Sequence, residues 1–247
     1  MNHSCLPVFI SALLAISALG NPLSVKAEYL LNFANSLEQA LNKKDDIAFK
    51  GILSVELASM IEKRYRKFLL MFPNAKWVVT PSTPLQDGRS TLEMLVTGTK
   101  QTGGHSFSLN SKQLLAIRKD RGRMLDYELI NAQAILINST KPIPLTINVP
   151  DAVLTGTRYD VDIFFDEPLG EAMVAGGLVS LTPEQVDNQV SPEIQLAPMG
   201  GGGLFKSVMA PFDPGQQTWA ALLIHPEAMI SITKQVRVVS EKEELLP

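Results

Sequence analysis

The stretch from Lys76 to Ile137 constrains the fold of this chain more than any other. Within it, runs of alternating apolar and polar residues are separated by turn residues: Asp87-Gly88, Thr102-Gly103-Gly104 and Lys119-Asp120-Arg121-Gly122. Alternation with a period of two is typical of strands that bury one face, and glycine supplies the positive φ that tight hairpin turns need. The pattern predicts four long antiparallel strands, the first of them at an edge because it contains Pro81.

Helical patterns precede these strands. Apolar residues at three- and four-residue steps predict helices over residues 28–42 and 54–72, with a short helical piece through Phe49 between them. Pro73 ends the last helix because proline cannot continue a helical hydrogen-bond ladder. Helices followed by a meander of antiparallel strands predict an α+β domain.

In its order and proportions, this part of the chain resembles the nuclear transport factor 2-like superfamily. The resemblance covers about residues 28–138 and includes paired helices, a strand entered after a proline, and a closing strand of the form Asp120-Arg121-Gly122-Arg123-Met124-Leu125-Asp126-Tyr127. It implies a sheet curled into a cone around the long helix, with a ligand site at the cone mouth. We expect the following residues to line that pocket: Trp77, Met94, Phe107 and Tyr127. Members of the superfamily include isomerases, dehydratases, cyclases and non-enzymatic binding modules, so the resemblance leaves the function open.

The pattern changes after Lys141-Pro142-Ile143-Pro144. Short apolar runs separated by turn residues predict seven strands, at residues 145–149, 158–165, 173–181, 194–196, 204–209, 218–224 and 229–239. This spacing is typical of an immunoglobulin-like or fibronectin-like β-sandwich. The predicted domains are therefore an α+β domain over residues 28–140 and an all-β sandwich over residues 141–240, followed by a charged tail over residues 241–247.

An apolar run from Leu6 to Leu19 precedes all of these elements. Val25-Lys26-Ala27 provides the small or apolar residues that signal peptidase accepts, which predicts a signal peptide over residues 1–27. The alternative is an uncleaved membrane anchor, although the run is shorter than the roughly 20 residues that span a bilayer. The chain is therefore expected to be exported, to the periplasm, a thylakoid lumen or the extracellular space, with no transmembrane segment after processing. Its one cysteine, Cys5, would be removed, leaving neither a disulfide nor a thiolate site.

Composition and motifs limit the classes of partner. With 22 basic and 25 acidic residues, the chain has no excess of positive charge for nucleic acid. His105 and His225 stand alone, and the aspartates at 160, 162 and 166 lack the turn glycine of a calcium loop. The sequence therefore predicts neither a metal site nor a bound cofactor.

Two carboxylates are the only catalytic candidates. Strand periodicity places Asp126 and Glu128 on one face of the closing strand, and Leu125, Tyr127 and Leu129 on the other. If the acidic face lined the cone, a desolvated carboxylate could serve as a general base. The alternative is a solvent face, on which the acids pair with Lys112 or Arg118 of the neighbouring strand.

Three functions are consistent with these features. The first is a non-enzymatic exported protein of a bacterial envelope or lumen that binds an apolar small molecule or a protein partner in the cone, with the sandwich as a docking module. The second is a small-molecule isomerase or lyase that uses Asp126 or Glu128. The third is a structural subunit of a membrane-associated complex, which predicts an exposed apolar patch on the sandwich. The possible partners are an apolar small molecule and another protein or a second copy of this chain.

Overall fold

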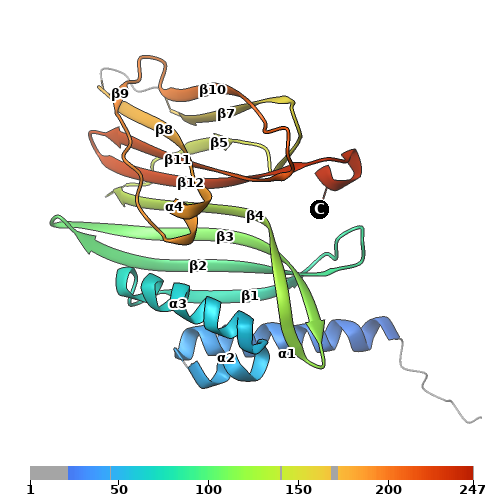
Figure 1. Ribbon diagram of the computed structural model, residues 1–247. Coiled ribbons are helices and arrows are strands. Elements are labelled where there is room, and N and C mark those ends of the chain that lie inside the picture. The colour runs from blue at the N-terminus through green and yellow to red at the C-terminus, as the bar shows by residue number, and fades with distance from the viewer. Residues whose placement is uncertain (1–21, 45, 140, 168–171, 247) are drawn as a thin grey trace, which may run out of the picture.

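The computed structural model describes residues 22–44, 46–139, 141–167 and 172–246 (Figure 1). The helices are α1 (Pro22–Lys43), α2 (Asp46–Ile52), α3 (Val55–Met71), α4 (Pro183–Asp187) and the 3-10 helix η1 (Lys242–Leu245). The long strands of the N-terminal half are β1 (Lys76–Ser82), β2 (Ser90–Thr102), β3 (His105–Asp120) and β4 (Arg123–Ser139). The remaining strands are β5 (Leu145–Asn148), β6 (Ala152–Leu154), β7 (Arg158–Phe165), β8 (Ala175–Leu181), β9 (Ala197–Pro198), β10 (Gly203–Met209), β11 (Gly215–His225) and β12 (Ala228–Val239).

The predicted fold class, an α+β cone followed by a separate β-sandwich, is wrong. The protein is mostly β, with 51% strand and 22% helix, and its strands form one large nine-stranded sheet. The order in this sheet is β1-β2-β3-β4-β12-β11-β8-β9, with β6 added beside β12. Residues 133–139 of β4 pair with residues 228–234 of β12, so the N-terminal meander and the C-terminal strands are hydrogen-bonded into the same sheet (Figure 1). Local periodicity could not predict this pairing, because the two segments lie far apart in the sequence.

The helices cover one face of the sheet over β1 to β4. Ser54 caps α3 by accepting a hydrogen bond from the Leu57 N–H, and α3 ends at Met71, before Pro73. The Ser54 N–H donates in turn to the Met124 carbonyl oxygen at 2.8 Å, which ties the start of α3 to β4. The core on this face contains buried residues of all three helices and of the strands, among them Ala34, Leu37, Phe49, Leu53, Leu57, Val79, Leu92 and Ile117.

A three-stranded sheet, in the order β10-β7-β5, packs on the C-terminal half of the large sheet. β4 contributes to the cores on both faces, since Ala134 and Leu136 pack against the helix-side core while Ile135 and Ile137 pack against the core under the small sheet. Successive residues of a strand point to opposite faces. The helices and the small sheet therefore cover opposite faces of the large sheet, one at each end.

Two irregularities in β4 change which side chains face the helices. The register with β3 skips one residue of β4 at Leu125 and another at Ile130. Each extra residue reverses the alternation of faces beyond it. Met124 and Tyr127 therefore both contact the helix-side core, whereas Leu125 is exposed. The prediction that Leu125 shares a face with Tyr127 and Leu129 is wrong for this reason.

Side chains of α1 form hydrogen bonds with the backbone of β1, at the edge of the large sheet. The side-chain amide of Asn42 donates to the Trp77 carbonyl oxygen at 2.7 Å and accepts from the Trp77 N–H at 2.9 Å. Glu38 accepts from the Val79 N–H at 2.9 Å. An exposed strand edge is a template for pairing with another chain. Here the edge strand β1 is instead bonded to α1, and this contact fixes the position of Trp77.

A segment from the C-terminal half reaches the helices. It comprises residues 182–195, which include α4, and we call it the α4 segment. Thr182 caps α4 through reciprocal hydrogen bonds with Gln185. In Figure 1 the segment crosses in front of the large sheet towards α3. It also packs tightly on β8, since a Cβ on Gly177 would lie 2.2 Å from the Gln195 carbonyl oxygen and 2.6 Å from Ile194 Cγ2.

Gly177→Ala should therefore displace the α4 segment. The added methyl group cannot be accommodated without moving the backbone of the segment, and overpacking of this kind costs about 1–3 kcal/mol. We expect lower thermal stability and faster proteolysis within residues 188–196. Gly200→Ala is the matched control, because a Cβ there meets no atom within 4 Å. Equal melting temperatures and cleavage rates for the two variants would contradict the close packing.

The predicted signal peptide lies mostly outside the described residues, which begin at Pro22, the first residue of α1. None of the helices described is both long and apolar enough to cross a membrane.

Candidate functional site

The helices and the sheet line an apolar cavity of about 350 Å³ between them, which is partly open to solvent. Its helical wall consists of residues from α1, α2 and α3, namely Leu37, Leu41, Phe49, Ile61, Tyr65 and Phe68. Its strand wall consists of residues from β1 to β4, namely Trp77, Leu92, Met94, Val96, Leu109, Leu115, Ile117, Met124, Tyr127 and Ala134. The polar lining residues are Arg64, Ser111, Gln113 and Gln189. This is the composition of small-molecule sites, which combine apolar walls with a few polar groups.

Aromatic contacts hold the two walls in place. The Tyr65 ring lies 5.2 Å from the Phe49 ring and 5.4 Å from the Trp77 ring, measured between centroids. Phe68 packs against Trp77 on the same side, at 5.6 Å. The Tyr65 hydroxyl donates to the Leu41 carbonyl oxygen, which links α3 to the end of α1. Ring pairs at these separations add favourable contacts beyond the burial of their area, so they help to fix α2, α3 and β1 relative to one another.

The α4 segment contributes the remaining polar part of the lining. Arg64 of α3 forms an ion pair with Asp187, at 2.7 Å between nitrogen and oxygen. Lys67 donates to the Asn188 carbonyl oxygen, and the Gln189 Nε2 donates to the Arg64 carbonyl oxygen at 3.4 Å. These contacts attach the segment to α3 and place the Gln189 side chain at the cavity. The Gln189 Oε1 is buried and has no hydrogen-bond partner among the described residues.

The structure places the predicted pocket residues in different environments. Trp77, Met94 and Tyr127 line the cavity. Phe107 is buried but is not a lining residue, and its ring lies 6.4 Å from the ring of His105. Sequence reasoning missed Gln189, because it lies in the predicted sandwich and belongs to no recognisable motif.

The two candidate catalytic carboxylates lie outside the cavity. Asp126 has a side chain that is 63% exposed, and it lies 3.7 Å from Arg118, the neighbour that the solvent-face alternative named. Glu128 pairs with Arg89 at 2.6 Å. Arg64 is the one charged residue among the described lining residues, so the cavity holds no carboxylate that could act as a general base.

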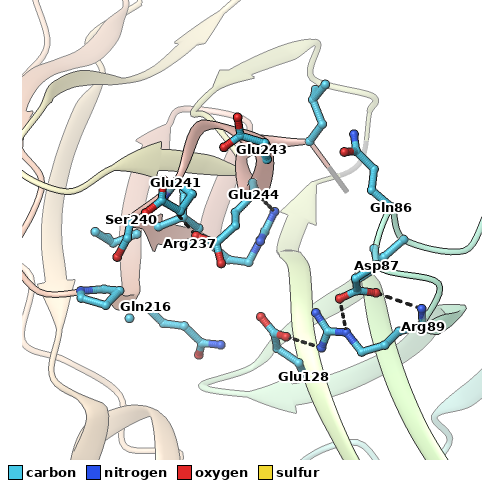
Figure 2. Close-up of a pocket in the computed structure, with 16 residues that line it drawn as sticks. Gln86, Asp87, Arg89, Glu128, Gln216, Arg237, Ser240, Glu241, Glu243 and Glu244 are labelled. Atoms are coloured by element: carbon cyan, nitrogen blue, oxygen red, sulfur yellow. Dashed lines mark hydrogen bonds and ion pairs between the residues drawn. The ribbon is translucent and has the colours of Figure 1, made fainter.

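Glu128 instead lines a second, larger hollow of about 690 Å³ (Figure 2). This groove lies between the turn that follows β1, the end of β12 and η1. Arg89 donates to Asp87 and to Glu128, both at 2.6 Å. Hydrogen bonds from the Arg89 backbone N–H and, to a lesser extent, from its side chain hold the pKa of Asp87 below its usual value. The hydrogen bond to Glu128 raises the pKa of Arg89.

Arg237, the other arginine of the groove, also has hydrogen-bond partners. Arg237 donates to the carbonyl oxygens of Ile130 and Glu244, each at 3.1 Å, and so joins η1 to the sheet. Charged groups that are already paired offer a ligand little net gain, because each existing bond must be exchanged for a new one. Both arginines of the groove are already bonded, so the apolar cavity is the better candidate site.

Apolar side chains are also exposed on the small sheet. Phe205 and Met209 of β10 are 61% and 49% exposed, and Phe212 beyond the strand is 83% exposed. Phe205 stacks on Phe164 of β7 at 5.9 Å between ring centroids. A role for this surface in docking a partner stays a prediction.

Comparison with known proteins bears on the C-terminal half only. No curated protein matches the chain. Residues 140–239 match the model of a domain of unknown function (DUF8623). This span contains β5 to β12 and the α4 segment, whereas the cavity is lined by residues 37–134 with the single addition of Gln189. The chain is thus similar in its C-terminal half to a family without an assigned activity, and the cavity lies almost wholly outside the matched span.

Proposed function

We propose that this chain binds an apolar small molecule in the cavity between α3 and β1 to β4. The observation that carries the proposal is the lining, in which sixteen apolar or aromatic residues surround a volume of about 350 Å³ together with four polar ones. This volume is at the lower end of the range of roughly 300–1,000 Å³ found for ligand sites. Protein interiors are normally packed to crystal-like density, so an unfilled space of this size within a core is unusual.

The proposed activity is binding without a chemical reaction. A base-catalysed isomerase or lyase needs a carboxylate or imidazole within hydrogen-bond reach of the reacting carbon acid. The Asp126 side chain is exposed and pairs with Arg118, the Glu128 side chain is half-exposed and pairs with Arg89, and neither lines the cavity. This arrangement favours binding over base catalysis by Asp126 or Glu128.

Titration with the fluorescent dye N-phenylnaphthylamine tests this proposal. The dye is neutral and apolar, and it emits strongly when it leaves water for an apolar site. We expect saturable binding of one dye per chain, with energy transfer from Trp77, which lies in the cavity wall. Decanol should displace the dye competitively. Emission that rises without saturation, or that decanol leaves unchanged, would contradict a specific apolar site.

The cellular setting of this function remains part of the proposal. Export rests on the apolar run before Gly20 and on the cleavage pattern before Glu28. An exported apolar-ligand carrier would meet its ligand outside the cytoplasm.

A further inference from the structure

The strand wall of the cavity contains two polar side chains whose hydrogen-bonding groups are unused. Ser111 and Gln113 of β3 line the cavity, and neither side chain has a hydrogen bond or an ion pair with another described residue. Ser111 is nonetheless a buried residue, with an exposed fraction of 6%. Buried polar groups nearly always have a hydrogen-bond partner, so an exception calls for an explanation.

The polar atoms of both side chains open onto the cavity. In the part of the chain that the structure describes, the one side-chain oxygen or nitrogen that is both fully enclosed and unpartnered is the Gln189 Oε1. The polar atoms of Ser111 and Gln113 are also unpartnered but are not enclosed, and the space that these residues line is the cavity. Strand alternation gives the same direction, because Leu109 and Leu115, two residues to either side, line the cavity too.

The polar pair lies within an apolar part of the sheet. Ser111 stands between Val96 of β2 and Ala134 of β4 in the register. Gln113 stands beside Met94 of β2. These three neighbours all line the cavity, as do the leucines on either side along β3. The pair therefore faces an interior part of a bound ligand, with apolar wall left over for both of the ligand's ends.

A pure hydrocarbon would be a poor ligand for this wall. It would take both polar groups out of water without giving either a hydrogen bond, and a buried polar group that is left unpaired is destabilising. A carbonyl oxygen has two lone pairs and no hydrogen, so the Ser111 hydroxyl and the Gln113 amide can each donate one bond to it. The two residues lie about 6.6 Å apart along the strand, and the longer glutamine side chain can close that gap.

The charge of the lining points to a neutral ligand. Arg64 is the one charged residue among the described lining residues, and Asp187 already pairs with it. An anionic ligand would have to displace that carboxylate, and a cationic ligand would meet a guanidinium. A neutral carbonyl compound meets neither obstacle.

We propose that the ligand of this cavity is a neutral, largely hydrocarbon molecule with an oxygen acceptor in its interior, such as a ketone or ester carbonyl, which accepts hydrogen bonds from Ser111 and Gln113. This inference rests on the proposed function and adds the chemical class of the ligand. The hydrocarbon parts on both sides of the oxygen lie among the aromatic and aliphatic residues of the walls.

Two isomeric ketones isolate the position of the oxygen. Dibutyl ketone and heptyl methyl ketone have the same composition, but the carbonyl lies at the middle of the first and next to one end of the second. Their difference in affinity therefore reports where the wall recognises the oxygen. One net hydrogen bond corresponds to about a tenfold difference in affinity. We expect the chain to bind dibutyl ketone about tenfold more tightly, measured by displacement of N-phenylnaphthylamine.

The double variant Ser111→Ala with Gln113→Met should remove this preference. It deletes the hydroxyl and the amide while nearly keeping the side-chain volumes, so the ratio of the two affinities should fall to about one. Its thermal stability should stay close to that of the unaltered chain, because apolar groups of similar shape replace polar groups that have no partner. Ser108→Ala is the control, since Ser108 is exposed on the opposite face of β3, and it should keep the tenfold ratio.

Four results overturn the inference, and they can be told apart. Equal affinities for the two ketones in the unaltered chain would show that the position of the oxygen is not recognised. A preference that survives in the double variant would place the recognition elsewhere. If the dye saturates and decanol displaces it, but neither ketone does, the ligand class fails while the proposed binding function stands. If the dye itself does not saturate, the proposed function fails and the ligand class fails with it.

Discussion

Ala134→Phe is expected to weaken the binding of decanol by on the order of a hundredfold. Ala134 lies on β4 and lines the strand wall of the cavity. The larger side chain would extend into the apolar space and occupy it in place of the ligand. Losing the burial of about one large apolar group costs roughly 3 kcal/mol, which corresponds to a hundredfold in affinity. Displacement of N-phenylnaphthylamine measures the effect, and thermal unfolding should show a stability close to that of the unaltered chain.

Gln133→Phe is the matched control for this variant. Gln133 is the adjacent residue of the same strand, so its side chain points to the opposite face of the sheet. It stands between Lys112 of β3 and Lys234 of β12 in the register, away from the cavity lining. We expect this variant to bind decanol with unchanged affinity. Unchanged affinity in Ala134→Phe as well would mean that the ligand binds elsewhere.

Ile232→Ala is expected to destabilise both ends of the molecule. Ile232 is 1% exposed, lies in the core under the small sheet, and stands opposite Ile135 where β12 pairs with β4. Truncation of a buried isoleucine to alanine costs about 2–5 kcal/mol. Because β4 also belongs to the helix-covered meander, the loss should reach that half too. Hydrogen exchange should speed up in β2 and β3 as well as in β11 and β12.

The neighbouring Ser231→Ala provides the control for that experiment. Ser231 pairs with Leu136 in the same ladder, but its replacement by alanine removes no methyl group from a core. It should leave the exchange of both halves near that of the unaltered chain. If Ile232→Ala accelerates exchange in β11 and β12 and leaves β2 and β3 fully protected, the two halves are energetically separate domains.

The elements with strong local signals were predicted well from the sequence. The helical stripe before Pro73 corresponds to α3, and the turns at Asp87-Gly88 and Lys119-Asp120-Arg121-Gly122 separate strands β1 to β4. These signals are local, since they depend on side-chain spacing and on residues that tolerate positive φ. The weaker elements were missed: β6 has three residues, and α4 is a five-residue helix without an apolar stripe.

The arrangement of these elements in the sheet could not be predicted from local sequence patterns. The ladder between β4 and β12 joins residues about 90 to 100 positions apart, from Ser139 with Ala228 to Gln133 with Lys234, and no local pattern in either strand identifies its partner. The skipped residues at Leu125 and Ile130 are set by the register with β3, and they reverse the faces that simple alternation assigned. The fold class was wrong because of the first effect, and the expected orientation of Leu125 was wrong because of the second.

The candidate site was only partly accessible from the sequence. Of the four residues expected to line a pocket, Trp77, Met94 and Tyr127 line the cavity, whereas Phe107 does not. The attachment of Gln189 to Arg64 depends on where the chain returns after β8, and no local pattern encodes that path. The resemblance of residues 28–138 to the nuclear transport factor 2-like superfamily, export, and docking to a partner stay predictions.

Native mass spectrometry of the chain purified gently from its own cells tests the central claim most directly. We expect a population heavier than the polypeptide by one small apolar molecule, which dissociates in organic solvent. The same preparation of Ala134→Phe should carry no such adduct. A bare polypeptide that also fails to take up added decanol, or an adduct retained in full by Ala134→Phe, would contradict binding in this cavity.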